Sequence, residues 1–266
     1  MDLLKIRQDL HDNGFVVVPF PKQIKASMIS YIKSYLQDVV EKRVNFNLQT
    51  RALDSDGISS DAILAIPDHE YVQNFSKPFR MYPDHVSQLI LTWIKPEFNK
   101  LLGVSKVDSN YVSPAERKIN QQLHATTHDI FWRCARLNKN DVGPAHCDYQ
   151  FWELAKGTED EVPVPFAYRE RWKLWVPLMG CGKENILQVM PSSHKENVPH
   201  QLIETAFGQR PCLDPKWYAV NECRFIAPIN NIADECIIFH DRLVHRGQKN
   251  NISNLRISSE LTILVS

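Results

Sequence analysis

The chain has no excess of charge of either sign, because 31 Lys and Arg residues balance 31 Asp and Glu residues over 266 positions. It also has no stretch in which basic residues are interleaved with aromatic ones, the pattern expected of a surface that binds nucleic acid. We therefore expect no nucleic-acid partner.

Long hydrophobic runs are missing as well. The longest apolar run, Phe15 to Phe20, contains Pro19 and is far shorter than the ~20 residues that cross a bilayer. The first residues, "MDLLKIRQDLHD", place charged side chains where a signal peptide would need an apolar segment. These absences predict a cytoplasmic protein with no membrane partner.

The sequence has no C-x-x-C pair, although it contains six cysteines. A chain of this length can bury a sufficient core without disulfides. We expect most of the cysteines to be reduced and buried, where they act as small hydrophobic residues. They are Cys134, Cys147, Cys181, Cys212, Cys223 and Cys236.

The N-terminal part, about 1–127, is expected to be rich in helices. Apolar residues recur at helical spacing over 3–10, before Gly14 and the strand-like "FVVVPF", and again over 24–40. A further helix is expected from Asp84, as a capping residue, to Gly103, bent or broken at Pro96. Residues 44–80 have few periodic apolar positions and are expected to be irregular.

The C-terminal part, about 128–266, has short β-type runs between turn residues. The runs are 131–137, 172–178, 186–190, 224–229, 236–239 and 256–265. This texture predicts a mainly β fold of the jelly-roll type with flanking helices. No repeat or linker divides the sequence, so we expect one domain over 1–266.

The segment "GPAHCD" places His146 and Asp148 two positions apart, so in extended backbone both side chains leave one face while Cys147 points away. Two imidazoles and one carboxylate on one face of a metal are the ligand set of non-haem Fe(II) oxygenases. With 10 His and 31 acidic residues, however, about one H-x-[DE] triplet is expected by chance. The chain has a second such triplet, which begins at His194.

A third ligand has two candidates in "IIFHDRLVHRGQKN". We favour His245, because it follows an apolar strand and precedes Gly247, a position easily aimed into a barrel mouth; His240 remains a competitor. Further on, Arg256 and Ser258 share one face of the last strand. A guanidinium grips a carboxylate through two charge-assisted hydrogen bonds, so this pair could hold a dicarboxylic co-substrate.

In their order, these segments resemble the phytanoyl-CoA dioxygenase branch of the Fe(II)/2-oxoglutarate-dependent oxygenases. The matching pieces are "GFVVVPF", "GPAHCD", "LWVPLMGC", "LQVMPSSHK", "CIIFHDRLVHRG" and "NLRISSE". The family's Pro-Gly-Ser-His-Lys turn has Ser192 in place of its glycine here. Residues 44–125 contribute nothing to the resemblance.

The resemblance implies a double-stranded β-helix that binds Fe(II) through His146, Asp148 and His245. It places His194 in a structural turn and prefers His245 to His240. It also implies that Arg256 and Ser258 bind the C5 carboxylate of 2-oxoglutarate. The expected reaction uses O2, releases succinate and CO2, and hydroxylates an unactivated C–H bond of a small molecule, such as a specialised metabolite in biosynthesis.

Candidate substrate-pocket residues are Arg133, Tyr149, Trp152 and Trp175, together with the loop 44–80. Three alternatives to hydroxylation stay open: a catalytically silent β-barrel that binds or regulates, an oxygenase that desaturates or cyclises, and another barrel metalloenzyme such as a cupin-type isomerase. The related halogenases leave the carboxylate position free for chloride, so Asp148 disfavours halogenation.

Overall fold

The main β-sheet has the strand order β1-β8-β4-β10-β2, and β3 pairs with the first part of β10 beside β2. We describe it from a computed structural model, which covers residues 3–43, 60–109, 128–158, 161, 169–205 and 208–266. All neighbouring strands are antiparallel. Their bounds are β1 Phe15–Pro19, β2 Val107–Ser109, β3 Ile130–Arg136, β4 Glu170–Met179, β8 Glu235–His240 and β10 Leu255–Val265.

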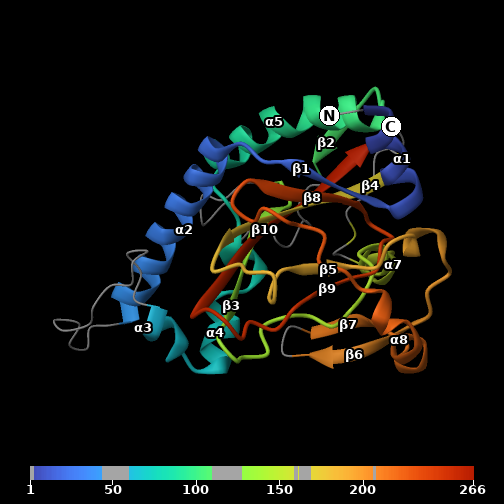
Figure 1. Cartoon of the computed structure of the whole chain (residues 1–266). Coiled ribbons are helices and arrows are strands. Elements are labelled where there is room, and N and C mark those ends of the chain that lie inside the picture. The colour runs from blue at the N-terminus through green and yellow to red at the C-terminus, as the bar shows by residue number, and fades with distance from the viewer. Residues whose placement is uncertain (1–2, 44–59, 110–127, 159–160, 162–168, 206–207) are drawn as a thin grey trace.

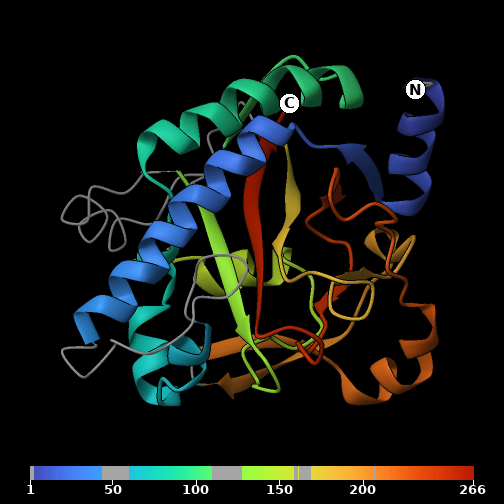
Figure 2. The same cartoon turned by 60° about the vertical axis from the view of Figure 1, so that its left-hand side comes forward.

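Helices cover one face of this sheet. The two longest, α2 (Lys22–Arg43) and α5 (Asp84–Leu102), run across it side by side (Figures 1 and 2). Shorter elements continue this layer: α1 (Leu3–Asn13), α3 (Ser60–Leu64), α4 (Asp68–Asn74) and the 3-10 helix η1 (Lys77–Arg80). None of the helices in the described ranges is long and apolar enough to span a membrane.

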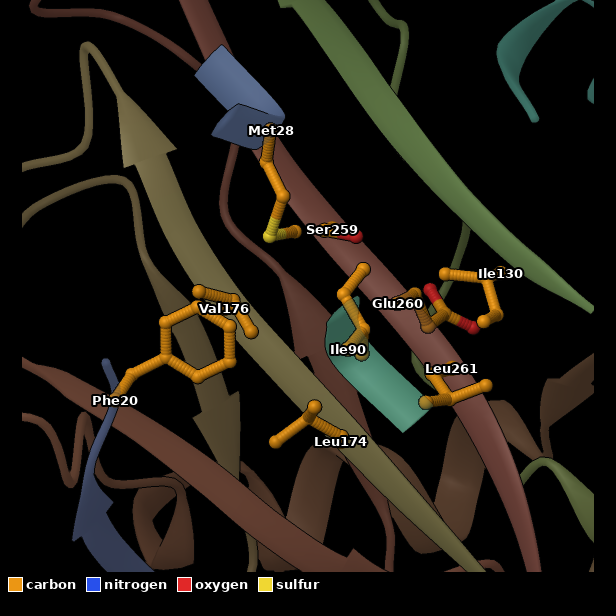
Figure 3. A pocket seen from close by; sticks show the side chains of 9 residues that line it. All are labelled: Phe20, Met28, Ile90, Ile130, Leu174, Val176, Ser259, Glu260 and Leu261. Carbon is orange, nitrogen blue, oxygen red and sulfur yellow. The ribbon is translucent and has the colours of Figure 1, made fainter. Parts of the chain in front are cut away.

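The principal core lies between these helices and the outer face of the sheet. Figure 3 shows Met28 of α2 and Ile90 of α5 reaching towards Leu174, Val176 and Leu261 of strands β4 and β10. The gap among these side chains has no room for a water molecule. Odd-numbered residues of β10 enter this core, so its even-numbered residues face the opposite side.

Phe98 of α5 gives a direct test of this packing, because its side chain is fully buried. The Phe98→Ala variant should lose about 3–5 kcal/mol of unfolding free energy through lost burial and the cavity left behind. Leu89 of the same helix is 45% exposed, so Leu89→Ala should change the free energy of unfolding by less than about 0.5 kcal/mol. Urea unfolding followed by circular dichroism measures both; equal effects would contradict the packing.

A smaller layer faces the inner side of the main sheet. Strands β5 (Leu187–Val189) and β9 (His245–Gly247) pair with each other, and Figure 1 shows them opposite the α2/α5 layer. Isolated bridges add the His146 segment beside β9 and the Ile226 segment beside β5. An apolar cluster fills the space between the layers: Trp175, Ile186, Leu187, Val189, Ile229, Ile237, Phe239 and Leu243. Two such layers form a double-stranded β-helix, which confirms the predicted fold class.

Other elements lie around the smaller layer. They are α7 (Tyr149–Ala155), η2 (Ser193–Lys195), the hairpin of β6 (His200–Thr205) and β7 (Gly208–Leu213), α8 (Pro215–Asn221) and η3 (Glu222–Arg224). All six cysteines lie in described residues and are free; Cys134, Cys147 and Cys236 are buried. The prediction of reduced cysteines is confirmed, but only half of them are fully buried.

Several expectations were wrong in detail. Helices α3, α4 and η1 occupy residues 60–80, which were expected to be irregular, because Ile63, Tyr71 and Phe75 are buried against the core. Residues 44–59 lie outside the described ranges. The expected strand 224–229 is reduced to one bridge at Ile226, since η3 occupies its start and Pro228 has no N–H to donate.

Helix α5 differs from expectation at both positions singled out. Pro83, not Asp84, is the capping residue, and no side-chain cap is formed; Asp84 lies in the first turn. The helix continues through Pro96 because Ile94 and Phe98 are both fully buried and hold it on the sheet. It ends at Gly103 in the left-handed conformation, as predicted.

Candidate functional site

The backbone brings His146 and His245 together across the smaller layer. The two residues exchange both backbone hydrogen bonds, with N···O distances of 3.1 and 3.0 Å, and their ring centroids are 4.5 Å apart. Each Nδ1 donates to a backbone carbonyl: His146 to Pro144 at 2.6 Å and His245 to Leu243 at 3.0 Å. Because a carbonyl only accepts, each ring carries a proton on Nδ1, and Nε2 is the nitrogen left to act as a metal ligand.

Asp148 completes the cluster. Its Oδ1 lies 3.9 Å from Nε2 of His146, and its Oδ2 lies 3.5 Å from Nε2 of His245. One ligand atom from each residue falls within 4.8 Å of the others. The carboxylate is 7% exposed, and its Oδ2 has no hydrogen-bond partner among the described residues.

The local backbone at Asp148 differs from the expected extended strand. Asp148 has φ −64° and ψ −33°, and it starts helix α7. Cys147 still points away from the two polar residues, into an apolar cluster with Met190 and Val244. The chain turns into a helix directly after Cys147, and the carboxylate remains beside His146.

Burial and the neighbouring charge of His245 lower the pKa of His146 to about 4. The imidazole is therefore neutral at pH 7, which is the form that binds a metal. Two imidazole nitrogens and one carboxylate with an unpartnered oxygen fit a divalent metal of the non-haem iron type.

The two competing histidines lie elsewhere. His240 accepts a hydrogen bond from the backbone N–H of Arg242 and packs against Trp172. Nε2 of His194 donates to the carbonyl of His11, and its ring occupies the position that a side chain at Gly14 would fill. Neither ring belongs to the cluster of ligand atoms.

Arg256 and Ser258 face the inner side of the main sheet, as the alternation along β10 requires. Arg256 is 4% exposed, and its Nη1 donates to the carbonyls of Asn185 at 2.7 Å and Gln248 at 2.9 Å. The Nε of Arg256 and the Oγ of Ser258 are buried without a partner among the described residues. Two unpartnered donors next to each other on one strand face fit a carboxylate ligand.

A chain of charged side chains leads from Asp148 along the inner face of the sheet, and of its members beyond Asp148 only Arg133 was named from the sequence. Nζ of Lys173 lies 3.7 Å from Asp148 Oδ2 and 2.8 Å from Glu260 Oε1, and it donates to Thr262 Oγ1 at 3.0 Å. Nε of Arg133 donates to Glu260 Oε2 at 2.7 Å. Extending the i, i+2 alternation from Arg256 and Ser258 would have singled out Glu260 and Thr262.

These partners set the charge states of the buried pair. Burial alone would lower the pKa of Lys173, but the carboxylates of Asp148 and Glu260 outweigh it and raise the pKa above its usual value. Burial would raise the pKa of Glu260, but Arg133 and Lys173 hold it well below its usual range. Both residues are therefore charged at pH 7.

The four candidate pocket residues fall in three different places. Trp175 is 4% exposed and packs in the inner apolar cluster with Phe239, whose ring lies 4.9 Å from that of His245. Tyr149 and Trp152 of α7 line a separate cavity of about 600 Å³, and its lining includes none of the three ligand-type residues. Only Arg133 belongs to the charged chain that ends at Asp148.

Comparisons with known proteins give a structural match but no sequence match. No family model matches the chain, and no curated protein matches it. The phytanoyl-CoA dioxygenase branch therefore stays a prediction.

Three solved structures share the fold over nearly the whole chain. The apo structure of ThoJ, a non-heme monooxygenase, has a TM-score of 0.54 at 13% identity and covers 98% of this chain and 77% of its own. EvdO2 from Micromonospora carbonacea var. aurantiaca, complexed with 2-oxoglutarate, has a TM-score of 0.50 at 13% identity, and the match covers 100% of this chain and 91% of EvdO2. EvdMO1 has a TM-score of 0.51 at 15% identity, covering 98% and 50%. At these identities the likeness establishes that this chain has their fold.

Proposed function

We propose that the protein is an Fe(II)- and 2-oxoglutarate-dependent oxygenase that hydroxylates an unactivated C–H bond of a small molecule, with release of succinate and CO2. The observation that carries this proposal is the cluster of His146, Asp148 and His245, in which both Nε2 atoms lie within 3.9 Å of a buried carboxylate. A metalloenzyme is also in keeping with the fold it shares with EvdO2, whose structure holds 2-oxoglutarate.

In this proposal His146, Asp148 and His245 hold Fe(II), and Arg256 with Ser258 holds the C5 carboxylate of 2-oxoglutarate. The bound iron would supply the oxidising chemistry, with O2 as the oxidant: one oxygen atom would go to the substrate C–H bond and the other to succinate, formed from 2-oxoglutarate with loss of CO2. Three protein ligands leave the other coordination positions for the co-substrate and oxygen.

The chain's own part is to orient the ligands and keep the site dry. The carbonyls of Pro144 and Leu243 fix the imidazole tautomers, and the inner apolar cluster restricts the entry of water. Lys173 lies beside the Asp148 carboxylate and is itself held by Glu260 and Thr262.

The test incubates the protein and 2-oxoglutarate with each of a panel of small metabolites and measures the succinate formed from 2-oxoglutarate. Mass spectrometry of the metabolite then identifies its product. We expect succinate to form only when Fe(II), 2-oxoglutarate and O2 are all present. A product 16 Da heavier than its substrate would establish hydroxylation, whereas a loss of 2 Da would establish desaturation or cyclisation. Binding of panel compounds without any succinate would favour a catalytically silent barrel.

A further inference from the structure

Arg133 differs from Lys173 and Arg256, which also lie on the inner face of the main sheet. Lys173 is enclosed by Glu260, Thr262 and Asp148, and Arg256 is 4% exposed. The side chain of Arg133 is 43% exposed, and only its Nε is engaged, by Glu260. Among the described residues its two Nη groups have no hydrogen-bond partner, so they can bind a ligand that enters from solvent.

The surroundings of Arg133 are positively charged. Three cations surround the ring of Phe131, with distances to its centroid of 5.3 Å for Lys77, 5.5 Å for Arg80 and 5.2 Å for Arg133. Lys77 is neutralised by Asp129 at 2.7 Å. Among the described residues Arg80 donates to the carbonyl oxygens of Phe75 and Trp132, which do not neutralise its charge.

The positive charge of Arg133 acts on two neighbouring arginines. Burial, and next the charge of Arg133, lower the pKa of Arg80 to about 10. Burial, and next the charge of Arg133, also lower the pKa of Arg210 on β7. Guanidinium groups from different elements repel one another, and an anion bound among them removes that cost.

The sum of charges in the proposed site, with Fe(II) and 2-oxoglutarate bound, also favours an anionic ligand. The two positive charges of Fe(II) cancel the two negative charges of 2-oxoglutarate. Among the charged chain and the proposed 2-oxoglutarate position, Arg133, Lys173 and Arg256 are positive, while Asp148 and Glu260 are negative. One positive charge is left over, before Arg80 is counted.

We infer that the substrate carries an anionic group, a carboxylate or a phosphate, which accepts hydrogen bonds from the Nη groups of Arg133. Arg133 is then a specificity-determining residue that anchors the substrate, whose reacting part extends towards His146, Asp148 and His245. This inference rests on the proposed function, because it takes the bound anion to be the substrate of the proposed oxygenase.

The experiment uses trifluoroacetate as a carboxylate probe and trifluoroacetamide as its neutral match. The full-length protein is loaded with Mn(II), which is paramagnetic, and with saturating 2-oxoglutarate, so that Arg256 is occupied. We expect Mn(II) to broaden the ¹⁹F signal of trifluoroacetate and not that of trifluoroacetamide. Monofluorophosphate serves as the phosphate probe. The anion that binds more tightly shows whether the substrate's anionic group is a carboxylate or a phosphate.

The Arg133→Met variant should bind the anion about 10- to 100-fold more weakly, the loss of one or two charge-assisted hydrogen bonds. It should fold, because Glu260 keeps Lys173 as its partner at 2.8 Å. Arg242→Met is the matched control, since Arg242 is an exposed arginine that stacks on Tyr149. This control should bind the anion like the wild type.

Equal binding of trifluoroacetate and trifluoroacetamide would overturn the inference, and so would unchanged anion binding by Arg133→Met. A loss of 2-oxoglutarate affinity in Arg133→Met would also overturn it, because Arg133 would then bind the co-substrate. A wild-type protein that binds neither Mn(II) nor 2-oxoglutarate would instead contradict the proposed function. In that case ¹⁹F chemical shifts on the metal-free protein still report whether Arg133 binds the anion.

Discussion

The Asp148→Ala variant should bind Fe(II) at least about 100-fold more weakly than the wild type and form no succinate. Asp148 supplies the one carboxylate of the cluster, and its Oδ2 has no other hydrogen-bond partner in the described structure. Loss of a residue that merely orients a ligand already weakens metal binding by about 10- to 100-fold, so loss of the ligand itself should cost more. Equilibrium dialysis against Fe(II) under anaerobic conditions measures the effect.

Matched controls come from the histidines outside the cluster. His194→Ala and His240→Ala should bind Fe(II) like the wild type, whereas His146→Ala and His245→Ala should resemble Asp148→Ala. The Asp148→Ala protein should keep its fold, because Lys173 retains Glu260 as a partner. If His240→Ala lost the metal and His245→Ala kept it, the assignment of the third ligand would be wrong.

The second large effect is expected at Arg256. The Arg256→Ala variant should bind 2-oxoglutarate about 100-fold more weakly and still bind Fe(II), because the guanidinium offers a buried, unpartnered Nε to a carboxylate. Isothermal titration of 2-oxoglutarate into the metal-loaded protein measures the loss. Some loss of stability should accompany it, since Nη1 also holds the carbonyls of Asn185 and Gln248.

Ser258→Ala removes one neutral donor and should weaken 2-oxoglutarate binding by no more than about 10-fold. Arg242→Ala, at an exposed arginine three positions before His245, should leave this affinity unchanged. Full 2-oxoglutarate affinity in Arg256→Ala would show that another cation holds the co-substrate, and Arg133 would be the first to test.

The sequence predicted the parts of the fold where a periodic pattern decides the structure. Side chains of strand β10 point alternately into the helix-covered core and to the inner face. Arg256 and Ser258 are two positions apart, so their spacing alone predicted that they share a face. Helix α2 likewise followed from its apolar face. In both cases one local pattern agrees with the global fold.

Tertiary contacts decide the rest. Residues 60–80 form helices because Tyr71 donates to the carbonyl of Cys134, 63 positions away, a contact that no local pattern shows. Lys173 and Glu260 lie 87 positions apart and meet only because β4 and β10 are neighbours. The pairing of His146 with His245 depends in the same way on the bridge between their segments.

The central claim is that His146, Asp148 and His245 hold Fe(II) and leave room for 2-oxoglutarate to chelate it. Anaerobic addition of Fe(II) and then 2-oxoglutarate to the purified protein tests this directly, read as a weak visible charge-transfer band. We predict a band in the wild type and in His194→Ala that is absent from His146→Ala and Asp148→Ala. A wild-type protein that shows no band at saturating Fe(II) and 2-oxoglutarate would contradict the account.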